Sequence, residues 1–285
     1  MITLTASSIN FSNQVSAPQD GVDNVAQASV VPGYQTLVNN TAYIARTQSY
    51  TRPHISVGTQ SDSAITIFSY KGLWCSVTAP QEQWKEFEGS SPITLTSANL
   101  DTPGMFVAST NYYIYFTGIP NTFEISTATP DSTGTFKVVA GNEVINRRYV
   151  GSFITDASAK IMHFMMTDFK YNFATPSGLT NCSSVAFVSS MPSDLIFTNL
   201  PVLATKVDLY LILNNTAAVA GEEIFSYTAK GSEAYGYTDI TSIKGQTIRY
   251  IVPAFVGFST RRLTIKTNTA SGDVGAKITW IGYTE

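Results

Sequence analysis

The sequence has few of the residues from which enzyme sites are usually built. It holds only 2 cysteines, Cys75 and Cys182, and 2 histidines, His54 and His163. Two distant cysteines are too few for a disulfide framework or a four-ligand zinc site, so we expect two free, buried thiols. Any Ser-His or Cys-His nucleophile pair would have to use one of the two histidines. We interpret His163 as a core or interface histidine and His54 as a solvated loop residue.

Charge is also scarce in this sequence. Charged residues make up 13% of the chain and the net charge is −3, whereas an ordinary soluble domain has roughly 25% charged residues. Lysine and arginine are scattered, so nothing indicates binding to a phosphate backbone, and we expect no nucleic-acid partner. We interpret Arg147-Arg148 and Arg261-Arg262 as strand-end charges that are either solvated or paired across subunits, and we favour solvation.

Long apolar runs and familiar catalytic motifs are missing as well. No window approaches the ~20 apolar residues of a membrane span, and we expect neither membrane insertion nor a signal peptide. No nucleophile elbow, phosphate-binding loop, dinucleotide fingerprint or His-Glu-x-x-His helix occurs. We therefore predict no catalytic residue, no cofactor and no metal site. A glycan-cleaving acid pair is the lowest-ranked alternative, with candidates at Glu82, Glu86, Glu88, Asp194, Asp208, Glu222 and Glu223.

What the chain does contain is enough apolar surface for a core. Apolar residues make up 44% and aromatic residues 12% of it, with 15 Tyr and 16 Phe, which excludes disorder for most of the chain. Trp74 lies in an apolar strand pattern, so we expect it in the core. Tyr235 and Tyr237 flank a glycine, and either a contact surface at a loop tip or a packed turn fits them.

The N-terminal fifty residues differ from the rest. Residues 1–29 are rich in Ser, Asn, Gln, Asp and Ala, which is typical of an extended arm. Within residues 31–46 the apolar spacing becomes helical, with a narrow stripe of Tyr34, Leu37, Val38, Thr41 and Ala45. Such a stripe favours a helix that packs on copies of itself, the alternative being a short helix packed on its own β-domain. We predict an anchoring arm and trimerising helix over residues 1–50.

Beyond Thr51 the apolar period becomes two, the period of a strand. Alternating runs at 112–116, 123–125 and 136–138 are separated by turn clusters at 118–121, 129–134 and 140–142. Residues 80–88 fit a helical turn or a strand. The Ala-Thr-Pro-Ser-Gly run at 174–178 breaks the pattern, and similar runs resume after it. We therefore expect a first β-domain at 51–173 and a second at 174–285.

Three segments resemble parts of tailed-bacteriophage fibre, spike and collar proteins. They are PGYQTLVNNTAYI at 32–44, the β-domain segments YYIY at 112–115, FEIS at 123–126 and RRYVGSF at 147–153, and AKITWIGY at 276–283. The resemblance implies a homotrimer whose helix gathers three chains near the attachment end. Together, pattern and resemblance predict an all-β fold: two antiparallel β-sandwich, jelly-roll-like domains after an extended arm and short helix, assembled as a trimer.

The same resemblance implies a structural role in a virion, made in the host cytoplasm. The expected partners are further copies of this chain and virion proteins such as portal, collar, tail or capsid. A face poor in charge and rich in Ser, Thr and aromatic side chains suits subunit contacts. The alternative hypothesis is that the C-terminal domain binds a surface polysaccharide of the host.

Overall fold

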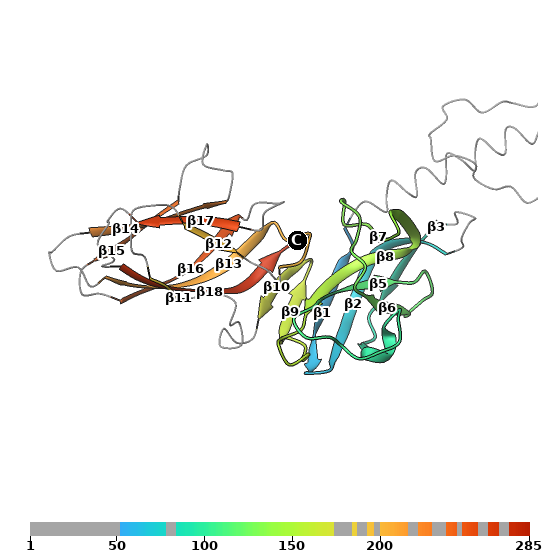
Figure 1. Cartoon of the computed structure of the whole chain (residues 1–285). Coiled ribbons are helices and arrows are strands. Elements are labelled where there is room, and N and C mark those ends of the chain that lie inside the picture. The colour runs from blue at the N-terminus through green and yellow to red at the C-terminus, as the bar shows by residue number, and fades with distance from the viewer. Residues whose placement is uncertain are drawn as a thin grey trace, which may run out of the picture. The chain divides into compact units, whose positions relative to one another are not determined.

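The computed structural model describes residues 52–77, 84–173, 184–186, 193–196, 200–215, 222–229, 238–243, 247–255, 262–267 and 274–285. These residues form strands joined by turns, with one 3-10 helix and no α-helix among them (Figure 1). The expectation of an all-β fold is confirmed for this part of the chain. The predicted helix, with Tyr34, Leu37, Val38, Thr41 and Ala45, lies outside the described residues, as do Cys182, Tyr235, Tyr237 and Arg261.

The described strands follow one another along the chain in two groups. The first group is β1 (His54–Ser61), β2 (Ala64–Ser76), β3 (Trp84–Gly89), β4 (Ile93–Leu95), the 3-10 helix η1 (Ser97–Asn99), β5 (Asn111–Phe116), β6 (Phe123–Ser126), β7 (Phe136–Val139) and β8 (Asn142–Ile154). The second group is β9 (Phe164–Thr167), β10 (Lys170–Phe173), β11 (Ser184–Ala186), β12 (Ser193–Ile196), β13 (Lys206–Asn215), β14 (Glu222–Ala229), β15 (Thr238–Ile243), β16 (Thr247–Phe255), β17 (Arg262–Thr267) and β18 (Val274–Thr284). Of the segment left open between helix and strand, residues 84–88 belong to β3.

The described residues divide into two compact units that are discontinuous in sequence. Unit 1 contains residues 52–56, 66–105 and 112–152 as far as they are described, and unit 2 contains 57–65, 106–111 and the described residues from 153 onward. The domain boundaries expected at 51–173 and 174–285 remain predictions.

Unit 1 contains an antiparallel sheet of four strands in the order β6-β5-β8-β7. Strands β7 and β8 are joined by the two-residue loop Ala140-Gly141, in which both residues have positive φ, the geometry that matches the twist of a hairpin. A cluster of four rings fills the interior: Phe116 of β5 contacts Phe123 of β6, Phe87 of β3 and Tyr70 of β2, at centroid distances of 5.3, 4.7 and 5.9 Å.

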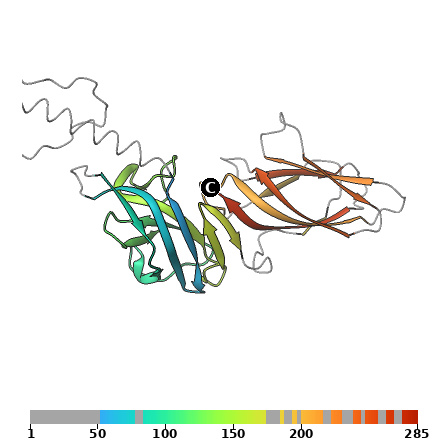
Figure 2. The same cartoon turned by 180° about the vertical axis from the view of Figure 1, so that it is seen from behind.

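Unit 2 contains two sheets. One includes strands in the order β16-β13-β18-β10-β9-β1, with β11 also paired to β18, and the other has the order β12-β17-β14-β15. Figures 1 and 2 show them as two layers, and β14 contacts β16 while β13 contacts β15. Strand β10 pairs with the end of β18 in the register Tyr171 to Tyr283, and these two rings stack at 4.1 Å. The C-terminal end of β18 is thereby paired and packed within the core of unit 2.

Candidate functional site

Unit 1 encloses a cluster of four charged side chains, which we call the Lys137 cluster. Lys137 Nζ lies 2.6 Å from Asp101 Oδ2 and 2.8 Å from Glu124 Oε1, and Arg147 Nε lies 2.6 Å from Glu124 Oε2. The hydroxyl of Ser126 also donates to Asp101 Oδ2, at 2.6 Å. One amine is therefore held between two carboxylates. Nominal charges of two anions and two cations cancel within the cluster.

The backbone explains why these groups meet. Glu124 and Ser126 lie on β6, Lys137 on β7 and Arg147 on β8, all strands of the four-stranded sheet. Asp101 follows η1, and its backbone N–H donates to the Ile125 carbonyl at 2.9 Å, which fixes it beside β6. Residues far apart in sequence are thus brought together by strand order and one backbone hydrogen bond.

Electrostatics within the Lys137 cluster favour charged groups despite the burial. Burial by itself raises the pKa of the Asp101 carboxyl, but hydrogen bonds from Lys137 and Ser126 outweigh it and hold that pKa below its ordinary value. The Lys137 amine also lies 5.7 Å from the centre of the Tyr115 ring. Burial raises the pKa of the Tyr115 hydroxyl far above its usual range, and this hydroxyl donates to the Ala128 carbonyl at 2.7 Å.

The interpretation of Arg147 and Arg148 as solvated strand-end charges is wrong. Both lie inside the long strand β8; Arg147 is paired with Glu124, and Arg148 is only 1% exposed. The Arg148 guanidinium donates to the Thr135 carbonyl at 3.1 Å and lies 5.7 Å from the centre of the Phe136 ring. The sequence of β8 alone could not predict that Arg148 is buried. A buried cation needs hydrogen-bond acceptors, and an acceptor for Arg148 is the Thr135 carbonyl, outside β8.

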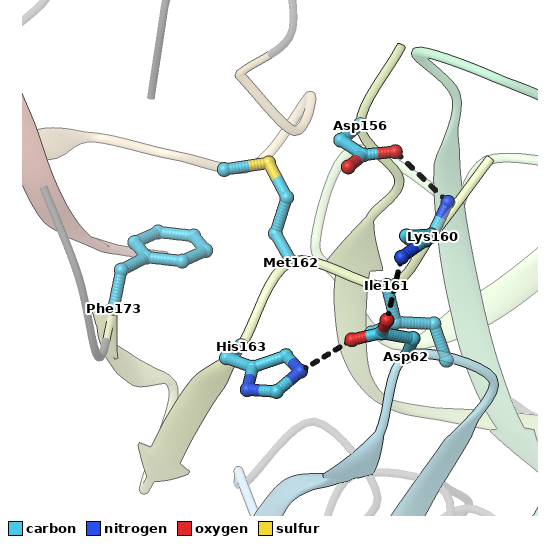
Figure 3. Close-up of a pocket in the computed structure, with 7 residues that line it drawn as sticks. All are labelled: Asp62, Asp156, Lys160, Ile161, Met162, His163 and Phe173. Carbon is cyan, nitrogen blue, oxygen red and sulfur yellow. Dashed lines mark hydrogen bonds and ion pairs between the residues drawn. The ribbon is translucent and has the colours of Figure 1, made fainter. Parts of the chain in front are cut away.

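Unit 2 has an open polar pocket, shown in Figure 3. Its volume is about 260 Å³, and it is lined by Asp62, Asp156, Lys160, Ile161, Met162, His163 and Phe173. Asp62 lies at the centre of the polar side: Lys160 Nζ is 2.9 Å from Asp62 Oδ2, and His163 Nε2 is 2.9 Å from Asp62 Oδ1. The Asp156 carboxylate accepts a hydrogen bond from the Lys160 backbone N–H at 2.9 Å, which holds the turn between these two residues.

The Asp62 carboxyl is stabilised in its charged form. Hydrogen bonds from Lys160 and then from His163 lower its pKa, and in return the bond to Asp62 raises the pKa of Lys160. The side chains of Asp62, Lys160 and His163 are all about half exposed, so solvent screens these pairs. Chemically, the pocket offers a carboxylate, an ammonium and an imidazole to a small polar group.

The core interpretation of His163 is wrong. Its side chain is 51% exposed and lies just before β9, where the alternating pattern has not yet begun. His54 is exposed, as expected, but it is the first residue of β1 rather than a loop residue. Of the candidate carboxylates, Glu86 and Glu88 lie on β3 with exposed side chains.

Cys75 agrees with the expectation of a free, buried thiol. It is 0% exposed and unpaired by any disulfide, and burial raises the pKa of its thiol to about 12. Trp74, expected in the core, is half-buried instead, and so is Trp84. Thiol chemistry at Cys75 is therefore disfavoured at neutral pH, because the thiolate is the reactive form.

Neither a metal centre nor a membrane helix emerges from the described residues. In that part of the chain no group of three or more His, Cys, Asp or Glu side chains is arranged to hold a metal ion. The same residues include no helix that is long and apolar enough to span a membrane.

Comparison with known proteins adds a distant similarity to a solved structure. No model of a protein family matches the chain, and no curated protein matches it. Among solved structures, the chain is similar to a Bacillus thuringiensis Cry1Da tryptic core variant, with 13% sequence identity and a TM-score of 0.24. The match covers 85% of this chain and 54% of that one. A similarity of this extent carries no argument about fold or function.

Proposed function

We propose that this chain is the subunit of a homotrimeric, fibre-type structural protein of a bacteriophage particle. Residues 1–50 attach it to a portal, collar, tail or capsid protein, and two β-sandwich domains project from the particle. The proposal combines the resemblance carried by residues 32–44, 147–153 and 276–283 with the character of the described surface. It assigns the chain no catalytic step.

The observation that carries the proposal is the distribution of charged and apolar side chains. Lys137 and Arg148 are buried in unit 1, and Arg147, at 28% exposure, is paired with Glu124. Large apolar side chains on strands are left exposed instead, among them Ile251 at 66% and Met165 at 47%. Such side chains favour protein contacts when they lie in patches, and subunit interfaces are depleted of charge at their centres. Exposed apolar side chains on strands are what the proposal expects where further copies of the chain pack.

Two contacts support the sandwich part of the proposal. In unit 1 the rings of Phe87 and Tyr70, from β3 and β2, pack on Phe116 of the four-stranded sheet. In unit 2 the strand pairs β14 with β16 and β13 with β15 bring two sheets together. Side chains between two antiparallel sheets are the core of a sandwich.

The mass of the protein in solution tests the trimer. The full chain of 30.9 kDa should have a mass of three subunits by light scattering. Leu37→Glu places a charge in the predicted apolar stripe and should yield single subunits that keep their β circular-dichroism spectrum. Thr36→Glu adds the same charge one residue away, outside the stripe, and should remain trimeric. A mass of one subunit for the unchanged chain contradicts the proposal.

The place of the arm is tested by assembly. A chain that lacks residues 1–50 should fold but no longer join particles, and normal incorporation of that chain contradicts the attachment role. Recognition of a host surface polysaccharide through residues 174–285 is the alternative proposal. A folded trimer that binds neither host cells nor their glycans would count against the alternative and leave the structural role intact.

A further inference from the structure

The Lys137 cluster has a feature that ordinary ion pairs lack. A single amine nitrogen touches two carboxylates at once, Asp101 at 2.6 Å and Glu124 at 2.8 Å. The Lys137 side chain is 8% exposed, and the Glu124 side chain is 15% exposed. A nucleophile, a carboxyl carbon and a second carboxylate that can move protons are therefore held together, with little water around Lys137 and Glu124 and more around Asp101, whose side chain is 27% exposed.

We propose that Lys137 and Asp101 condense to form an intramolecular amide bond, with Glu124 as the proton-transfer group. Lys137 Nζ attacks Cγ of Asp101, the Nζ–Cγ bond forms, and one Cγ–O bond breaks. The released oxygen leaves as water with two protons from the ammonium group, and the amide nitrogen keeps the third. The step needs no oxidant, reductant or cofactor, since it is a condensation.

Proximity supplies the main driving effect. Nζ is in hydrogen-bond contact with Asp101 Oδ2, one covalent bond away from the carbon that it must attack. Fixing two reactants in contact converts a bimolecular condensation into an intramolecular one. The Asp101 backbone is held to Ile125, and the Ser126 hydroxyl holds its carboxylate at 2.6 Å. Asp101 is thus held both by its backbone and by its carboxylate.

The charges of the cluster fit the reaction as well. Attack requires the neutral amine and the protonated acid, which arise when a proton passes from Nζ to the carboxyl along their hydrogen bond. The hydrogen bonds that hold the Asp101 pKa below its ordinary value oppose this transfer, so the protonated acid is the minor form from which attack proceeds. Glu124 Oε1 contacts Nζ and can accept its second proton for delivery to the leaving oxygen. After condensation Glu124 keeps Arg147 as its counterion, so no uncompensated charge is left inside.

The way out for the water molecule is also present. The Asp101 side chain is 27% exposed, more than the Lys137 side chain that attacks it. The water molecule released at the carboxyl carbon can therefore leave toward solvent on the Asp101 side. The bond would connect two segments 36 residues apart within unit 1, and it depends neither on trimer formation nor on the phage assignment.

Intact mass under denaturing conditions tests the bond. The unchanged full-length chain should be lighter by one water molecule than its sequence requires. The Lys137→Arg variant keeps the positive charge but cannot condense in this way, and it should show its full mass with the same N-terminal processing. Lys160→Arg is the matched control: Lys160 pairs with Asp62 at 2.9 Å but both are about half exposed, so this variant should lose one water as the unchanged chain does.

Peptide mapping then locates the crosslink. Digestion of the unchanged chain should yield one branched peptide that joins the segment containing Asp101 to the segment containing Lys137. This result does not depend on whether the variants fold. Glu124→Gln should show the full mass; loss of water in this variant overturns the role given to Glu124. Full mass of the folded, unchanged chain, with Asp101 and Lys137 recovered in separate linear peptides, overturns the proposal.

Discussion

Replacement of Phe116 by alanine tests the packing of unit 1 most directly. Phe116 is 0% exposed, and its ring contacts Phe87, Phe123 and Tyr70 at centroid distances of 4.7, 5.3 and 5.9 Å. Two of these partners lie on β2 and β3 and one on β6. Truncation of this one side chain therefore removes the ring that all three other rings share.

The expected loss follows from the kind of site. A buried Phe→Ala change costs about 3–5 kcal/mol, and the cost is higher where the surroundings cannot collapse into the cavity. Contacts between rings contribute about 0.5–1.5 kcal/mol per pair beyond the area that they bury. Because three rings line this site from different strands, the loss should lie in the upper half of the range, about 4 kcal/mol. A domain has only about 5–15 kcal/mol in total.

Urea unfolding followed by tryptophan fluorescence provides the assay. Trp74 of β2 and Trp84 of β3 report on unit 1. Protein concentration must be kept fixed, since any assembly makes stability depend on it. Phe116→Ala should lower the midpoint with little change in slope. The control Ile119→Ala, at a side chain that is 59% exposed, should change stability by no more than about 0.5 kcal/mol.

A small loss for Phe116→Ala would refute the reasoning. If it falls below about 1 kcal/mol, or matches the loss for Ile119→Ala, the four rings are not the packed interior that their distances indicate. The proposed sandwich of unit 1 would then lose its main support.

Two further outcomes are expected in unit 2. Gly282→Ala should cost about 1–3 kcal/mol of stability, as overpacking does, because a Cβ at Gly282 would overlap the Tyr171 carbonyl oxygen. The control is Gly104→Ala, since the nearest atom to a Cβ there is 4.0 Å away. Equal losses of stability in the two variants would contradict the argument. Carboxyl NMR should find the pKa of Asp62 below its ordinary value and shifted upward in Lys160→Ala but not in Lys170→Ala. Because folding lowers the Asp62 pKa, the Asp62–Lys160 pair stabilises the fold at pH values above the ordinary carboxyl pKa, and this stabilisation is lost as the pH falls through the lowered pKa. An unchanged Asp62 pKa in Lys160→Ala would contradict the role given to Lys160.

The alternating runs predicted several strands well. Those at 112–116, 123–125 and 136–138 correspond to β5, β6 and β7, and the cluster at 140–142 contains the hairpin loop between β7 and β8. Period-two alternation is a local property, because successive side chains of a strand point to opposite faces. It could not give strand order or the extent of β8, whose first half shows little alternation of apolar residues.

The charged residues mark the limit of such reasoning. Glu124 and Lys137 stand at polar positions beside apolar neighbours, a pattern that usually indicates a solvated face. Only the strand order, with Asp101 fixed to Ile125, brings them together inside unit 1. Glu124 and Lys137 could have been recognised as partners because both occupy polar positions on strands of one sheet. That pattern is informative only when the neighbours of each strand are known.

The sequence by itself determined that the part of the chain described by the structure is built from strands, that Cys75 is a buried free thiol, and where several turns fall, because each depends on neighbouring residues or on composition. Only the tertiary structure decided that Arg148 is buried, that Lys137 lies between two carboxylates, and that Asp62 meets His163 across 101 residues of sequence. Whether a charge is solvated or paired depends on groups that other segments supply, and the pattern of one strand carries no record of them.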